Sequence, residues 1–101
     1  MREAIEKARQ RLGELDNFLA DRKVLSDRNL LLKYGKERSG LEPLVAKAGE
    51  YEQVQKDIRG AEEIIQTSDE KELIELAETE LEALSERKNT IERELKELLL
   101  P

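Results

Sequence analysis

The sequence predicts an all-α protein: an elongated antiparallel helical bundle or coiled-coil hairpin of three long helices, the second bent near Pro43. Three observations lead to this prediction. Apolar residues recur at alternating steps of three and four along much of the chain. Charged residues make up 42% and aromatic residues 3%, a composition that suits a narrow seam between long helices better than a wide core. Residues that can cap a helix stand at the two boundaries between the three periodic segments, Ser26 and Asp27 at the first and Thr67 and Ser68 at the second.

The predicted first helix covers residues 2–20. Its apolar face carries Ile5, Ala8, Leu12, Leu15 and Leu19, which keep the alternating spacing. The pattern breaks around residues 20–24. Ser26 or Asp27 then offers a side-chain oxygen that can accept hydrogen bonds from the first amides of the next helix.

The predicted second helix covers residues 27–66. Its inner face carries Leu31, Tyr34, Leu41, Val45 and Ala48, and then Tyr51, Val54, Ile58, Ala61 and Ile65. Pro43 lacks an amide donor and crowds the preceding turn, so we expect one long helix that bends there. Thr67 and Glu70 fit a capping box for the third helix, and Ser68 is a second possible cap. A connection this short predicts an antiparallel hairpin.

The predicted third helix, residues 69–99, has the most regular pattern. Its 3.5-residue repeat forms a coiled-coil seam of Ile74, Ala77, Leu81, Leu84, Lys88, Ile91, Leu95 and Leu98. We expect the stem of Lys88 to cover apolar neighbours while its ammonium reaches water. A role in fixing the helix register is the alternative. Leu98–Leu99–Leu100–Pro101 presents apolar side chains on several sides, which predicts that the chain continues into another domain.

The residue types restrict the chemistry of the chain. There is no Cys and no His, which excludes a thiolate site and removes the commonest general base and metal ligand. Acidic pairs such as Glu62/Glu63 and Glu78/Glu82 lack other ligand types, so we expect them to be solvated. The sequence therefore predicts no catalytic residue, no cofactor and no metal site. No apolar run reaches the roughly 20 residues of a membrane span, so we expect a cytoplasmic protein without a membrane or small-molecule partner.

Charge is distributed unevenly along the chain. The net charge of −6 combines +3 over residues 1–41 (10 basic, 7 acidic) with −9 over residues 42–101 (8 basic, 17 acidic). The candidate nucleic-acid contacts in the basic part are Arg22, Lys23, Arg28, Lys33, Lys36 and Arg38. Ordinary solubilising charge is the alternative interpretation of this group.

Several short segments occur in the order found in one family. They are Leu19-Ala20-Asp21, Val24-Leu25-Ser26-Asp27, Leu41-Glu42-Pro43-Leu44-Val45, Tyr51-Glu52, the acidic stretch from Glu70 to Glu82, and Leu98-Leu99-Leu100-Pro101. Over residues 12–101 the chain resembles the N-terminal domain of bacterial class I peptide chain release factors, of the type that reads UAA and UAG. Arg22 and Arg28 depart from the pattern, because proline is common there in this family.

The resemblance implies that residues 1–101 form a single helical N-terminal domain of a longer factor, acting in translation termination. It also implies contact with the ribosome near the stalk base, through ribosomal RNA and protein, and with the remaining domains of the factor. The Gly-Gly-Gln loop and the Pro-x-Thr element of the family are absent from this sequence, so no catalytic or codon-reading residue is carried over. A free-standing coiled-coil adaptor or scaffold that binds a partner helix is the alternative interpretation.

Overall fold

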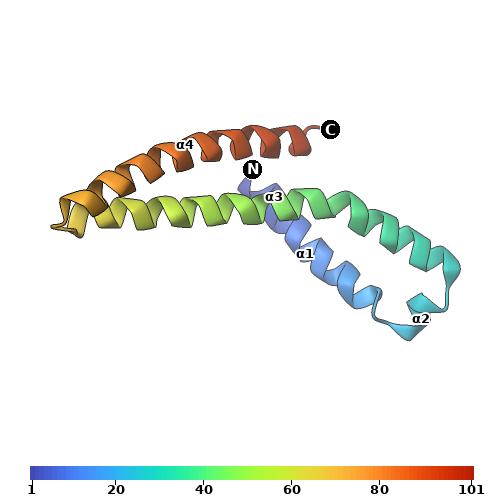
Figure 1. Cartoon of the computed structure of the whole chain (residues 1–101). Helices are drawn as coiled ribbons and strands as arrows, with labels where there is room; N and C mark the ends of the chain where they lie inside the picture. Colours follow the sequence, from blue (N-terminus) through green and yellow to red (C-terminus); the bar gives the residue numbers. More distant parts are fainter. The chain divides into compact units, whose positions relative to one another are not determined.

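The computed structural model describes all residues, Met1–Pro101. It contains four α-helices and no strand: α1 (Arg2–Phe18), α2 (Arg22–Leu25), α3 (Arg28–Thr67) and α4 (Lys71–Leu99) (Figure 1). The predicted all-α fold with its three long helices is confirmed. The chain divides into two compact units, which are described separately. Unit 1 comprises Met1–Ala46 with Leu98–Pro101, and unit 2 comprises Lys47–Glu97.

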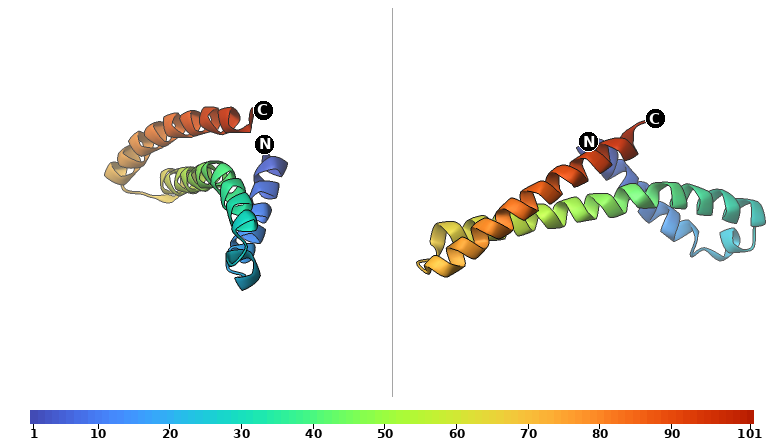
Figure 2. Two further views of the ribbon diagram at one scale, coloured as in Figure 1. Left: turned by 90° about the vertical axis from the view of Figure 1, so that its right-hand side faces the viewer. Right: turned by 45° about the horizontal axis from the view of Figure 1, so that its top comes forward.

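In unit 1, α1 lies against the first part of α3 (Figure 2). Ala8 and Leu15 are buried and stand seven residues apart, so they occupy one face of α1. The ring of Phe18 stacks on that of Tyr34, with 4.8 Å between the ring centroids. These contacts join the apolar face of α1 to that of α3.

The short helix α2 was not predicted from the sequence. Its start is capped by Asp21, whose Oδ1 accepts a hydrogen bond from the Lys23 amide at 2.9 Å. Val24 is buried, which anchors this turn to the core of unit 1. A single helical turn carries too few residues to show a 3.6-residue period, so the sequence pattern indicated only a break.

Of the two predicted caps for α3, Asp27 takes the role. Its Oδ1 accepts hydrogen bonds from the amides of Asn29, at 3.0 Å, and Leu30, at 3.2 Å. The Ser26 hydroxyl instead donates to the Arg22 carbonyl oxygen at 2.7 Å, back into α2. The α3 helix then continues for 40 residues with Pro43 inside it, as one helix and not two.

The inner face of α3 differs from the prediction at its first turn. Leu31 is 36% exposed, whereas Leu30 is half-buried together with Tyr34, Leu41 and Val45. The step from Leu30 to Tyr34 is four residues, which keeps both on the side that faces α1. Placing Leu31 on the inner face was therefore wrong, and this leucine remains accessible.

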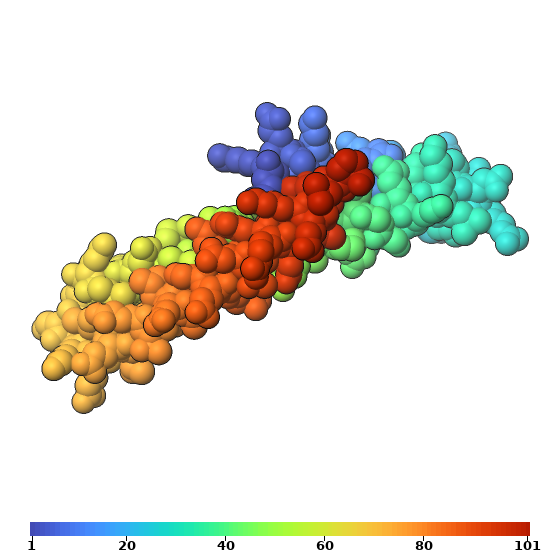
Figure 3. Space-filling model, turned by 90° about the horizontal axis from the view of Figure 1, so that it is seen from above, coloured from blue at the N-terminus to red at the C-terminus, as the bar shows by residue number.

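In unit 2, the second part of α3 and most of α4 form an antiparallel pair whose side chains lie in contact (Figures 1 and 3). Buried residues come from both helices: Ala48, Val54, Ala61, Ala77, Ile91 and Leu95. The remaining predicted seam residues Ile74, Leu81, Leu84 and Lys88 are half-buried. The predicted seam thus holds from Ile74 to Leu95. It fails at Leu98, which is 43% exposed and belongs to unit 1.

The connection between α3 and α4 is Ser68–Glu70. The Ser68 hydroxyl oxygen accepts a hydrogen bond from the Glu70 amide at 3.1 Å. The predicted capping box of Thr67 and Glu70 is wrong, because α3 extends through Thr67. The Thr67 hydroxyl therefore donates to the Glu63 carbonyl oxygen, one turn back in α3, at 2.8 Å.

Polar contacts also join the two helices of unit 2. The Tyr51 hydroxyl donates to Glu92 Oε1 at 2.6 Å, and this hydrogen bond raises the pKa of Tyr51 to about 12. The ammonium of Lys47 pairs with Glu50 on its own helix at 2.8 Å and with Glu94 on α4. These two hydrogen bonds raise the pKa of Lys47, with Glu50 as the first cause. The half-buried Lys88 makes no ion pair, in keeping with a stem that covers the seam.

Candidate functional site

The six predicted contact residues all lie in unit 1. Arg22 and Lys23 are on α2, and Arg28, Lys33, Lys36 and Arg38 are on α3. The first five are exposed, whereas Arg38 is half-buried. The structure thus brings the basic group together on the short helix and the first turns of the next one. Arg38 differs from the other five because its side chain is half-buried.

The basic residues of α3 share an exposed face. At about 100° per residue, Arg28, Lys33 and Lys36 fall within an arc of about 140°. No acidic residue occurs between Arg28 and Lys36, and the first acid beyond them on the helix is Glu37, which interacts with Lys33. Asn29 and Leu32 lie on the same arc, and both are exposed. This face therefore offers accessible cations to an anionic partner.

Arg38 has a structural role instead. Its Nε donates to Asp16 Oδ1 on α1 at 2.6 Å, and its Nη1 donates to Glu42 Oε2 at 3.1 Å. The hydrogen bond to Asp16 is the main reason why the pKa of Arg38 is raised. A guanidinium held by two carboxylates is already neutralised, so we assign Arg38 to the packing of α1 on α3.

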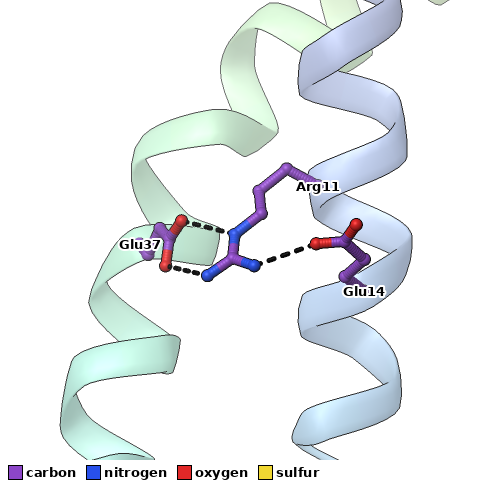
Figure 4. A network of polar contacts seen from close by, with 3 residues as sticks. All are labelled: Arg11, Glu14 and Glu37. Atoms are coloured by element: carbon purple, nitrogen blue, oxygen red, sulfur yellow. Dashed lines mark hydrogen bonds and ion pairs between the residues drawn. The ribbon is translucent and has the colours of Figure 1, made fainter.

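A second arginine supports the same packing. Arg11 on α1 faces Glu37 on α3 and donates twice to its carboxylate, from Nε to Oε1 at 2.7 Å and from Nη2 to Oε2 at 3.1 Å (Figure 4). Its Nη1 donates to Glu14 Oε2 at 2.9 Å. The guanidinium also lies over the Phe18 ring, 5.7 Å from its centroid. Bidentate pairing of this kind fixes orientation as well as distance, so it holds α3 in register against α1.

Sequence reasoning did not identify the Arg11–Glu37 and Arg38–Asp16 pairs. Their partners are 26 and 22 residues apart, and no spacing rule connects charges on different helices at such separations. A spacing rule exists only for pairs three or four residues apart on one helix, such as Arg11 with Glu14 and Arg38 with Glu42.

The Arg11–Glu37 pair predicts a pH dependence of stability. The hydrogen bond from Arg11 lowers the pKa of Glu37 below its usual value. A depressed carboxylate pKa stabilises the fold above the unfolded pKa of about 4.3, and this stabilisation disappears as the pH falls below it. In Glu37→Gln we therefore expect a lower denaturant midpoint at pH 7 and a shallower loss of stability between about pH 5 and pH 3.

Denaturant midpoints of the parent chain and the variant, measured across this pH range, check the expectation. Glu82→Gln removes an exposed carboxylate that makes no ion pair, and it should leave the pH 7 midpoint unchanged. Parallel pH profiles for the parent chain and Glu37→Gln would show that the pair does not stabilise the fold.

The chemistry available on this surface is electrostatic. No group of three or more acidic side chains is placed to hold a metal ion. The core contains no buried polar or charged side chain. No helix is both long enough and apolar enough to cross a membrane. The exposed guanidinium and ammonium groups can bind phosphate oxygens by charge-assisted hydrogen bonds.

Comparison with known proteins relates the chain to one family. The family model described as the PCRF domain matches residues 8–101. Over 101 residues the chain is 40% identical to peptide chain release factor 1 of Geotalea uraniireducens and 33% identical to that of Oceanobacillus iheyensis. These matches cover the whole chain and 28% of each relative. The factor 1 of Clostridioides difficile is 40% identical over 88 residues, which is 87% of this chain and 25% of that protein.

The chain thus spans about a quarter of the length of these relatives. No solved structure matches it. The family resemblance predicted from the short sequence segments is confirmed, since the match covers nearly every residue. The chain belongs to the PCRF domain family, which it shares with proteins named peptide chain release factor 1.

Proposed function

We propose that this chain is the ribosome-contacting domain of a peptide chain release factor and acts in translation termination in the cytoplasm. The observation that carries the proposal is the family match over residues 8–101, together with relatives named peptide chain release factor 1 that align along the whole chain. The domain works by positioning the factor and performs no chemistry of its own. Peptide hydrolysis and codon reading belong to other parts of the factor, since the Gly-Gly-Gln and Pro-x-Thr elements do not occur in these 101 residues.

The contact surface in this proposal is the exposed basic group on α2 and α3. It consists of Arg22, Lys23, Arg28, Lys33 and Lys36. Ribosomal RNA presents phosphate groups that attract such a surface and release counterions when it binds. The region of the ribosome that we propose is the stalk base, where RNA and protein lie together. Arg38 contributes indirectly, because its ion pair with Asp16 holds α3 against α1.

The test is charge reversal in a release factor that carries this domain. Arg22→Glu, Lys23→Glu and Arg28→Glu together should weaken ribosome binding. They should also reduce the slope of log affinity against log salt by about one unit for each phosphate group that the variant no longer binds. The matched control reverses three exposed cations of unit 2, Lys56→Glu, Arg59→Glu and Lys71→Glu. It makes the same change in net charge and should leave affinity and slope close to those of the parent.

Two further measurements separate binding from chemistry. At saturating factor, the single-turnover rate of peptide release should be nearly the same for the reversed variant and the parent, because binding and hydrolysis lie in different domains. The 101-residue chain alone should release no peptide. Unchanged affinity and salt slope in the reversed variant would reject the contact surface, and release activity of the chain alone would reject the proposed function.

A further inference from the structure

Two exposed stripes on the long helices have the same layout and opposite charge. On α3, Leu32 stands four residues after Arg28 and four before Lys36. On α4, Leu76 stands four residues after Glu72 and four before Glu80. Residues four apart follow one another along the same side of a helix, about 6 Å apart along the axis. Each stripe therefore presents a leucine between two like charges.

The two leucines are unusual in their exposure. Leu76 is 67% exposed and Leu32 is 62% exposed, which makes them the most exposed large apolar side chains within any helix of the chain. All four flanking charged residues are exposed as well, and none of them makes an ion pair. Both stripes are consequently unpartnered in the monomer.

The acidic stripe belongs to a wider apolar surface on unit 2. Ile64 is 40% exposed and Leu73 is 44% exposed. Each of them stands one position before a residue of the packed inner face of its helix, and the same is true of Leu76 and Glu80. In an antiparallel pair, residues with this offset point to the same side. A shallow hollow lies beside Leu76, lined also by Glu72, Glu75 and Thr79. This side of the hairpin can thus receive an apolar side chain between acidic groups.

The basic stripe matches this surface in both respects. Leu31, 36% exposed, adds apolar area next to Leu32, and no acid occurs between Arg28 and Lys36. If two such helices pack face to face, Leu32 of one contacts Leu76 of the other. About 6 Å along the axis on either side of these leucines, a cation then lies opposite a carboxylate. We propose that the occupant of each stripe is a second copy of this chain, with Arg28–Leu32–Lys36 of one copy on Glu72–Leu76–Glu80 of the other.

A second copy uses both stripes, and it would compete with the proposed RNA contact for Arg28 and Lys36. Both halves of the proposed interface are present on this chain, and exposed leucines add nothing to phosphate binding. The interface joins two different surfaces, so copies can associate either reciprocally, as a closed pair, or head to tail. Its small area predicts weak association that is sensitive to salt. The proposal does not depend on a role in termination.

Sedimentation of the 101-residue chain tests the proposal. We expect association between about 10 µM and about 1 mM at low salt, and at least about tenfold weaker association at about 0.3 M salt. Reversing one stripe, by Arg28→Glu with Lys36→Glu or by Glu72→Lys with Glu80→Lys, should weaken self-association at least about tenfold.

Glu78→Lys with Glu82→Lys is the control, because it makes the same charge change as the second pair. Both residues follow inner-face positions, so they lie on the opposite side of α4. This control should associate as the parent does. Circular dichroism verifies that each variant is folded.

Mixing gives the decisive measurement. The two reversed variants together restore every charge pair, so a 1:1 mixture should associate at least as strongly as the parent. Adding both Leu32→Ala and Leu76→Ala to each of the two reversed variants should weaken the mixture about tenfold, because no pair of leucines then buries apolar surface between the copies. A parent chain that stays monomeric up to about 1 mM at low salt would overturn the proposal. So would a mixture that associates equally well without the leucines, or stripe reversal with no effect. A monomer whose basic stripe binds an RNA oligonucleotide would identify RNA as the occupant instead.

Discussion

Leu95→Ala should lower the free energy of unfolding by about 2–5 kcal/mol. Leu95 lies on the seam of α4 and has no exposed surface. Truncation removes buried apolar atoms and leaves a cavity that the packed helices of unit 2 fill only in part, so both effects destabilise the fold. Domains of this size have only about 5–15 kcal/mol of stability, so the decrease is a large fraction of the total.

Urea unfolding followed by circular dichroism measures this effect. With a slope of about 1–3 kcal/mol per M, the midpoint should fall by about 1 M or more. Leu76→Ala is the matched control, because it makes the same chemical change on the same helix at a side chain that is 67% exposed. It should change stability by less than about 0.5 kcal/mol. Similar decreases for both variants would contradict the assignment of Leu95 to the core.

Replacing the five glycines by alanine should stabilise the protein. The substitutions are Gly13→Ala in α1 and Gly35→Ala, Gly40→Ala, Gly49→Ala and Gly60→Ala in α3. None of these glycines has a positive φ angle, and a Cβ atom added at any of them meets, within 4 Å, nothing beyond its chain neighbours and the nearby backbone of its own helix. Each change should add about 0.4–1 kcal/mol, because alanine loses less conformational entropy than glycine when the helix forms. Together they should add about 2–5 kcal/mol.

Thermal unfolding is a sensitive measurement for this set. For a domain of this size, 1 kcal/mol corresponds to about 4–8 °C, so the combined variant should melt more than about 10 °C above the parent. The reverse substitution provides the control: Ala46→Gly, at an exposed position inside α3, should lower the melting temperature by a few degrees. A combined variant that melts at or below the parent temperature would show that at least one glycine is required by packing or by the backbone.

Features with a local cause could be predicted from the sequence alone. The three long helices follow from apolar spacing, and the seam holds from Ile74 to Leu95 because a 3.5-residue repeat keeps those positions on one side. Asp27 could be named as one of two caps, because a cap needs only a short oxygen-bearing side chain before the first turn. The family could be recognised from the order of short segments. The basic residues could be named, although their accessibility could not be predicted.

The tertiary structure decided what depends on neighbours far along the chain. It turned Leu30 inward and left Leu31 exposed, because the position of α1 determines which side of α3 is covered. It engaged Arg38 with Asp16 and Arg11 with Glu37, and so divided the predicted contact residues into five accessible cations and one structural arginine. Helical periodicity specifies which residues share a face, since it arises within one turn. Which face meets which partner is set only when the helices pack, and with it which charges stay free for another molecule.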